Sequence, residues 1–289
     1  MLSAAAFGLF AVLIRVAGDE GADAVSVMAT RFVIAAPILW GIAAVVARRA
    51  GESLLPGRRV AVGGFALGFV GYSTQAALFQ GSVNTTGAAL ADLMLYAYPA
   101  MVLLLAWAMG REGPTPMRFA ALGVATVGTI LVLLGGGGST FDGVGIALGL
   151  GAALTYTIYI LGCDAVVRGL SPFTLAALVS TGAACAFAGA GFVGIGGGLD
   201  LGFTTTAWWA VIGVAIVGTV VAVGAFLISL GLIGPSRSSI LSTLEPVVTV
   251  VLAYLLLDER LGPVQLVGGA LVLAACVLLQ LRPGRAARG

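Results

Sequence analysis

The chain has 289 residues, of which 60% are hydrophobic and 9% charged, and its formal net charge is +2. An ordinary soluble domain carries about 25% charged residues, so this composition excludes a water-exposed surface over most of the molecule and predicts an integral membrane protein. All fourteen cationic residues are arginine, histidine is absent, and the three cysteines lie in apolar runs without ligand spacing. We therefore expect no nucleic-acid partner, no metal site and no cofactor.

Apolar runs long enough to cross about 30 Å of hydrocarbon recur along the whole chain. They are separated by short segments rich in glycine, proline and acidic residues, which are typical turn formers. The pattern predicts an all-α integral membrane protein with ten transmembrane helices, at 1–18, 24–47, 60–80, 87–109, 118–135, 143–162, 172–195, 207–228, 238–257 and 263–281.

The arginines between these runs predict the orientation, because short cytoplasmic loops collect positive charge. With the N-terminus inside, eleven arginines fall on the cytoplasmic side, two fall near the outside and one, Arg31, lies within a span. We therefore expect both termini to face the cytoplasm and the chain to cross the cytoplasmic membrane of a bacterium several times.

The second half of the chain resembles the first at a fixed offset of 147 residues. Matching residues include glycine, proline and glutamate, which two unrelated apolar segments would seldom share in register: Gly71 with Gly218, Gly87 with Gly234, Pro99 with Pro246, Ala106 with Ala253, Glu112 with Glu259, and Pro116 with Pro263. Five spans per copy place the copies upside down relative to each other. The sequence thus predicts two inverted five-helix repeats, at 1–135 and 143–281, followed by a basic cytoplasmic tail at 282–289.

Three sequence features resemble the EamA family of the drug/metabolite transporter superfamily. They are the five-plus-five plan, the arginine of TRFVIAAP in the second span, and the segment YPAMVLLLAWAMGREGPTP. The resemblance is fullest in the segment SRSSILSTLEPVVTVVLAYLLLDERLGPVQLVGGALVLAACVLL of the last two spans. The resemblance covers nearly the whole chain. It implies an exporter of metabolites or amino acids with a central cavity between the repeats.

Arg31, Asp92 and Glu245 are the ionisable residues inside predicted spans. A charge near the bilayer centre costs about 2.5–3.5 kcal/mol on insertion scales, so each should face a partner or a cavity. Arg31 and Asp92 lie at similar depths from the outer ends of their helices, and we expect them to pair. Such a pair could anchor a substrate, or it could be an ion pair that only holds two helices together. The sequence favours neither interpretation.

Glu245 lies near the middle of its span, directly before Pro246. A carboxyl group in a weakly hydrated site binds a proton more readily than one in water, which makes Glu245 a candidate for coupling transport to protons. The alternative is a hydrogen-bonded glutamate that only fixes the helix. Pro99 and Pro246, which the repeat relates, are predicted to bend their helices and to act as a pair of hinges.

The remaining polar and aromatic residues within spans are candidates for lining a cavity, although each taken singly is more often packing between helices. Those selected as substrate contacts are Tyr72, Thr74, Gln75, Tyr96, Tyr156 and Tyr159, with Ser73, Tyr98 and Thr155 beside them in the sequence.

Taken together, these features predict a secondary transporter that exports a small solute, such as a metabolite or an amino acid, by alternating access with coupling to protons. The partners expected are the solute and the lipid bilayer. A passive facilitator of small solutes is the alternative within transport. A membrane-embedded enzyme acting on lipid is the rival from another class, and it is disfavoured because the sequence shows no cluster of catalytic groups.

Overall fold

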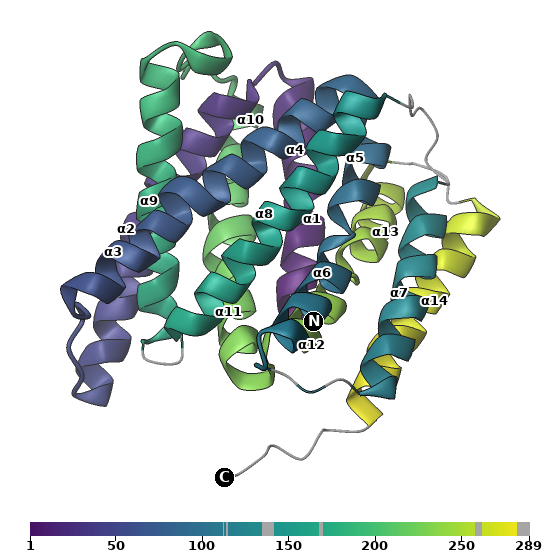
Figure 1. Cartoon of the computed structure of the whole chain (residues 1–289). Helices are drawn as coiled ribbons and strands as arrows, with labels where there is room; N and C mark the ends of the chain where they lie inside the picture. The colour runs from purple at the N-terminus through teal and green to yellow at the C-terminus, as the bar shows by residue number, and fades with distance from the viewer. Residues whose placement is uncertain (112, 114, 135–141, 168–169, 258–261, 282–289) are drawn as a thin grey trace.

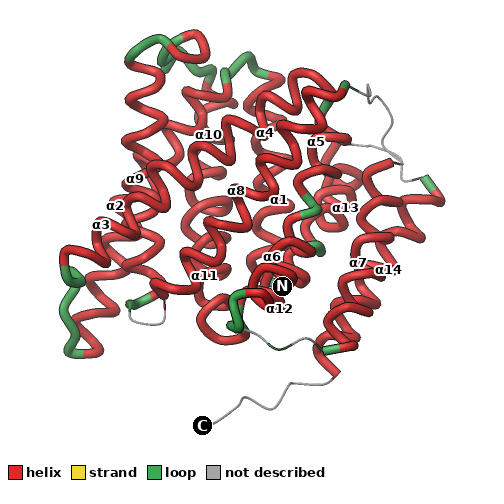
Figure 2. The backbone as a smooth tube through the Cα atoms, in the orientation of Figure 1, coloured by secondary structure: helices red, strands yellow, loops and turns green. Residues whose placement is uncertain are grey.

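The computed structural model describes all residues except 112, 114, 135–141, 168–169, 258–261 and 282–289. In that part of the chain it is all-helical and contains no strand (Figure 2). The predicted basic tail at 282–289, together with Glu112 and Glu259, lies outside the described residues.

The first half of the chain folds into seven α-helices and one π-helical segment. These are α1 (Leu2–Asp19), α2 (Ala24–Ala50), α3 (Arg58–Ala66), η1 (Leu67–Tyr72), α4 (Ser73–Thr86), α5 (Ala88–Leu95), α6 (Tyr98–Ala108) and α7 (Pro116–Leu134).

The second half follows the same order, with one short 3₁₀ helix added. Its elements are α8 (Gly143–Val167), α9 (Pro172–Phe192), η2 (Ile195–Gly197), α10 (Thr205–Gly213), η3 (Val214–Val221), α11 (Ala222–Ile233), α12 (Pro235–Ser242), α13 (Glu245–Leu257) and α14 (Pro263–Leu281).

The predicted apolar runs all fall on these helices, and eight of the described helical segments are long and apolar enough to cross a membrane. Local sequence signals set several helix ends. The Asp23 carboxylate accepts a hydrogen bond from the Ser26 amide at 2.9 Å and starts α2, while Thr204 does the same for α10. Gly51 ends α2 in the left-handed conformation.

Element bounds in the second half repeat those of the first at the offset found in the sequence. The pairs α5 and α12 and α7 and α14 have identical lengths at that offset, and the π-helical segments η1 and η3 begin at equivalent residues. A π-helical turn inside an α-helix is rare, so its presence at equivalent positions of both halves indicates a shared backbone design.

Pro99 and Pro246 do not bend continuous helices as the sequence predicted. Each span is interrupted two to three residues earlier, at Tyr96–Ala97 and at Thr243–Leu244, so the prolines lie in the first turns of α6 and α13. Proline suits a first turn because its missing N–H would have no helical partner there. Each span is thus interrupted directly before its proline, and the role of these two sites as hinges stays a prediction.

Gly87 and Gly234 separate the successive helices of each half and adopt nearly the same backbone conformation, with φ/ψ of 83°/161° and 81°/171°. Only glycine adopts this conformation without strain. We expect Gly87→Ala and Gly234→Ala each to lower the free energy of unfolding by about 1–3 kcal/mol. Gly41→Ala, inside α2 with open space at the Cβ position, is the control and should not destabilise the protein in the same thermal unfolding assay.

The two halves are interleaved rather than placed side by side (Figure 1). Helix α1 packs against α10, η3, α11 and α13, while α8 packs against η1, α4, α5 and α6. The first helix of each half therefore lies among helices of the other half. The most extensive contacts between the halves are those of α2 with α9 and of α7 with α14.

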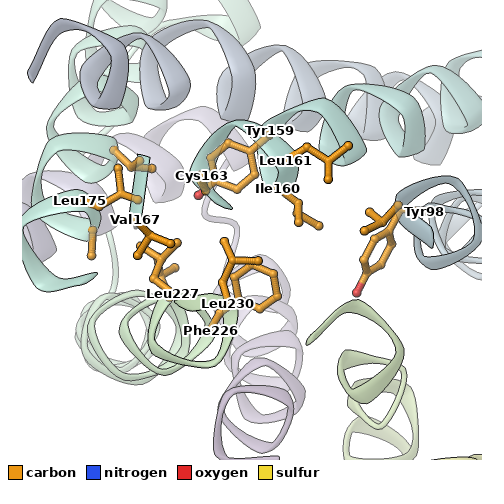
Figure 3. Packing of buried hydrophobic residues seen from close by; sticks show 14 of the residues in the cluster. Tyr98, Tyr159, Ile160, Leu161, Cys163, Val167, Leu175, Phe226, Leu227 and Leu230 are labelled. Atoms are coloured by element: carbon orange, nitrogen blue, oxygen red, sulfur yellow. The ribbon is translucent and has the colours of Figure 1, made fainter. Parts of the chain in front are cut away.

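The loops that follow α2 and α9 lie at opposite ends of the molecule (Figure 1). They contain Ser53 and Asp200, which are equivalent in the repeat and are both exposed. Between these ends, the main hydrophobic core is built from α6, α8, α9 and α11, as the cluster around Ile160, Leu175 and Leu227 in Figure 3 shows.

Candidate functional site

Arg31 on α2 is fully buried, and its surroundings are aromatic. The guanidinium carbon lies 4.3 Å from the ring centre of Phe32, 4.8 Å from that of Phe10 and 5.6 Å from that of Tyr72. Nη2 donates a hydrogen bond of 2.5 Å to the Tyr72 hydroxyl oxygen. Among the described residues, Nε and Nη1 have no hydrogen-bond partner. The side chain is therefore a buried cation held by ring faces and one neutral hydroxyl.

The predicted ion pair between Arg31 and Asp92 is wrong. Arg31 is hydrogen-bonded to Tyr72, and it makes no ion pair with any residue in the described part of the chain. Asp92 lies on α5, which packs against α4, α7 and α8 and not against α2. The two residues were predicted to lie at the same depth in the membrane. Their helices, however, occupy different places in the bundle, which keeps the side chains apart.

Five of the six tyrosines of the chain form one continuous series of ring contacts, which we call the tyrosine series: Tyr72, Tyr159, Tyr156, Tyr98 and Tyr96. The centroid distances along it are 6.0, 5.8, 4.8 and 6.1 Å. The series draws on both halves of the chain, because α8 from the second half lies between η1 and α6 of the first.

The tyrosine series joins Arg31 at one end to two carboxyl groups at the other. Glu245, the first residue of α13, lies within interaction range of the Tyr96 hydroxyl and of Asp92. Asp92, Tyr96 and Glu245 are each partly exposed. Tyr98 is equivalent to Glu245 in the repeat, and its hydroxyl donates a hydrogen bond of 3.5 Å to the backbone oxygen of Ser239.

Other residues selected from the sequence take different positions. Gln75 is buried but makes none of these contacts, and Thr74 is exposed. Ser73 and Thr155 hydrogen-bond to backbone oxygens of their own helical turns, at Phe69 and Gly151. Such bonds satisfy a hydroxyl within its own helix.

Sequence reasoning missed two parts of the arrangement. Phe10 and Phe32 contact Arg31, but a phenylalanine in an apolar helix carries no signal that separates it from ordinary packing. Asp164, buried on α8 near the other end of the bundle, forms an ion pair of 3.6 Å with Arg111. It was overlooked because α8 extends to Val167, beyond the predicted end of that span.

Tyr156 is the central member of the tyrosine series and contacts both Tyr98 and Tyr159. We expect Tyr156→Leu to lower the free energy of unfolding by about 1–3 kcal/mol, because two aromatic pairs worth about 0.5–1.5 kcal/mol each are lost while apolar burial is largely kept. Tyr254→Leu is the matched control, since Tyr254 is 51% exposed. Equal losses in the two variants would show that the ring contacts contribute nothing.

A bundle of apolar helices around a buried cation, carboxyl groups and tyrosines defines a multi-pass membrane protein with a polar site inside it. The family model of the EamA-like transporter family matches residues 1–134 and 143–281, nearly the whole chain. The chain belongs to this family. The resemblance seen in the sequence is thereby confirmed.

Known proteins similar to the chain agree with this assignment. A protein of Synechocystis sp. named "Uncharacterized transporter sll1319" is 27% identical over 68% of this chain, and the match covers 60% of that protein's length. An "Uncharacterized transporter" of Archaeoglobus fulgidus is 27% identical over 70% of each chain. One solved crystal structure shares the fold with a TM-score of 0.79 and 15% identity, over 96% of this chain and 95% of the other.

Proposed function

We propose that the protein is a secondary transporter that exports a small metabolite, such as an amino acid, across the cytoplasmic membrane by alternating access. In this proposal the chain crosses the membrane ten times as two inverted repeats, 1–135 and 143–281, with both termini in the cytoplasm. The matching element bounds of the halves and the distribution of the arginines support this arrangement.

One observation carries the proposal: the tyrosine series and the charges at its ends are built from both halves of the chain. Tyr72, Tyr96 and Tyr98 come from the first half, while Tyr156, Tyr159 and Glu245 come from the second. A site shared by inverted repeats becomes accessible from either side when one half moves relative to the other, which is the basis of alternating access. The same side chains would then contact the solute in both states.

The helix breaks before Pro99 and Pro246 are the proposed hinges. Each break lies directly beside a member of the site, since Tyr98 precedes Pro99 and Glu245 precedes Pro246. A rotation of α6 or α13 about its break would therefore move the site residue at its start, while α5 or α12 stays in place. Hinge residues absorb such backbone changes at the ends of elements.

Glu245 is the proposed proton-coupling residue. It is a partly exposed carboxyl group at the end of the tyrosine series, close to Asp92. Carboxylates inside membrane spans form the proton relays of many transporters. Protonation of Glu245 would alter the charge of the site between its two accessible states.

Metabolite analysis of the growth medium tests the proposal even though the solute is not specified. Cells that overproduce the protein are compared with cells that overproduce the Glu245→Gln or Arg31→Gln variant at equal membrane levels. The proposal predicts a solute that accumulates outside only with the unaltered protein. Accumulation that persists after the ion gradients are collapsed would instead indicate a passive facilitator, and no difference in any solute would contradict export.

A further inference from the structure

Arg31 is a buried cation with no anionic partner among the residues that the structure describes. Breaking a buried ion pair is strongly destabilising because the remaining charge is uncompensated, and a lone arginine within a membrane span is in the same situation. The three ring faces around Arg31 supply part of the missing stabilisation. They leave Nε and Nη1 without acceptors in the described structure. The site is therefore short of one negatively charged acceptor.

The one hydrogen bond that Arg31 makes lies where a carboxylate would bind. A guanidinium binds a carboxylate through two parallel hydrogen bonds, along either its Nε–Nη2 edge or its Nη1–Nη2 edge. Both edges include Nη2, the nitrogen that donates to the Tyr72 hydroxyl. A carboxylate that displaced this hydroxyl would gain Nη2 together with one of the two unpartnered nitrogens.

We propose that Arg31 binds the carboxylate group of the transported solute, and that the Tyr72 hydroxyl occupies this position while the solute is absent. The inference rests on the proposed transport function and specifies the class of solute, a small organic acid or zwitterion with an apolar body. The apolar body is implied by Phe10, Phe32 and Tyr72, whose rings would surround the group next to the carboxylate.

Tyr72, and not Phe10, is the side chain expected to move. The Phe10 ring lies so close to Gly218 that a Cβ atom there would collide with it, which holds the ring in place. Tyr72 lies at the junction of η1 and α4, where the hydrogen-bonding pattern changes from π-helical to α-helical. Its ring also contacts Tyr159 at 6.0 Å, so its displacement would reach the rest of the tyrosine series.

Binding of two matched probes to the purified full-length protein in lipid nanodiscs tests the proposal. The probes are 3-phenylpropanoate and its neutral amide, 3-phenylpropanamide, which have the same apolar body and differ in charge. We expect the acid to bind roughly tenfold or more tightly than the amide, measured by calorimetry and by the shift in unfolding temperature. Equal affinities for the acid and the amide would overturn the proposal.

Three variants assign the difference to Arg31. Arg31→Gln should abolish the preference for the acid, and Arg31→Lys, which keeps the charge but cannot form two parallel bonds, should retain part of it. Tyr72→Phe should bind the acid several-fold more tightly than the unaltered protein, because no hydroxyl has to be displaced. A preference retained in Arg31→Gln, or weaker acid binding in Tyr72→Phe, would contradict the proposal; Arg31→Lys gives the test if Arg31→Gln does not fold.

The result is separable from that of the export experiment. A protein that exports a solute but shows no preference for the acid would retain the proposed function and lose this inference. A protein that binds the acid through Arg31 but exports nothing would retain the carboxylate site and lose the transport function.

Discussion

Replacing Glu245 with glutamine is expected to uncouple transport from the proton gradient. Glutamine has nearly the same shape but cannot exchange a proton. A gradient of one pH unit is worth about 1.4 kcal/mol per proton, which corresponds to roughly tenfold accumulation of the solute. In liposomes that contain the purified protein, the unaltered chain should reach an accumulation of this order, whereas Glu245→Gln should only equilibrate the solute across the membrane.

Glu52→Gln is the matched control for this experiment, since Glu52 is an exposed residue in the loop after α2. It makes the same chemical change outside the site and should leave accumulation unaltered. An undiminished response of the Glu245→Gln variant to the pH gradient would exclude Glu245 as the proton carrier. The carboxyl group would then have only the structural role of a hydrogen-bonded residue at the start of α13.

Substitution of Gly68 by alanine is expected to cause the largest loss of stability among the close helix contacts of the bundle. Gly68 lies in η1 where it crosses α9, and a Cβ atom at this position would collide with the backbone oxygen of Val179. Gly182 on α9 meets the backbone oxygen of Phe65 in the same way. Small residues permit such close approach of helices in membranes. Because the obstacle is backbone, no side-chain rotation can relieve it.

We expect Gly68→Ala to lower the free energy of unfolding by about 1–3 kcal/mol or more, the usual range for overpacking. Gly63→Ala, on α3 with open space at the Cβ position, should raise stability slightly, because alanine is the better helix former. Opposite signs in thermal unfolding would confirm that the crossing of η1 with α9 depends on the absence of a side chain. Equal effects of the two substitutions would contradict it.

The helices could be predicted from the sequence because the bilayer imposes a simple rule: apolar runs of sufficient length separated by turn formers. The ends were less accurate. The third predicted span, 60–80, corresponds to helix from Arg58 to Thr86, since polar residues such as Gln80 and Asn84 continue the helix past the apolar run. Their side chains hydrogen-bond to each other at 2.9 Å one turn apart.

The candidate site was predicted in composition but not in arrangement. Depth along a span can be read from residue spacing, which is why Arg31 and Asp92 were placed at the same level. The direction in which a residue faces within the bundle depends on which helices pack together. Local sequence patterns do not predict that α1 and α8 pack among helices of the other half. For this reason the sequence paired Arg31 with an acid, whereas the structure surrounds it with aromatic rings.

The prolines illustrate the same limit on a smaller scale. Proline within an apolar run indicates an irregular backbone. Whether the helix bends or is interrupted depends on the conformation of the residues before the proline, which the proline alone does not predict. At Tyr96–Ala97 and at Thr243–Leu244 the interruption falls between each proline and the residue four positions before it, whose carbonyl loses its helical hydrogen-bond partner. The sequence match between the halves was more informative than the prolines alone, because it predicted the same backbone structure before Pro99 and before Pro246.

The orientation of two repeat-equivalent loops tests the central claim, that the halves are inserted oppositely around a shared site. Single cysteines are placed at Ser53 and at Asp200 in a cysteine-free variant and treated with a membrane-impermeant thiol reagent. We predict that intact cells show labelling at position 200 and none at position 53, and that lysed cells show both. Labelling of both positions, or of position 53 alone, in intact cells would contradict the account.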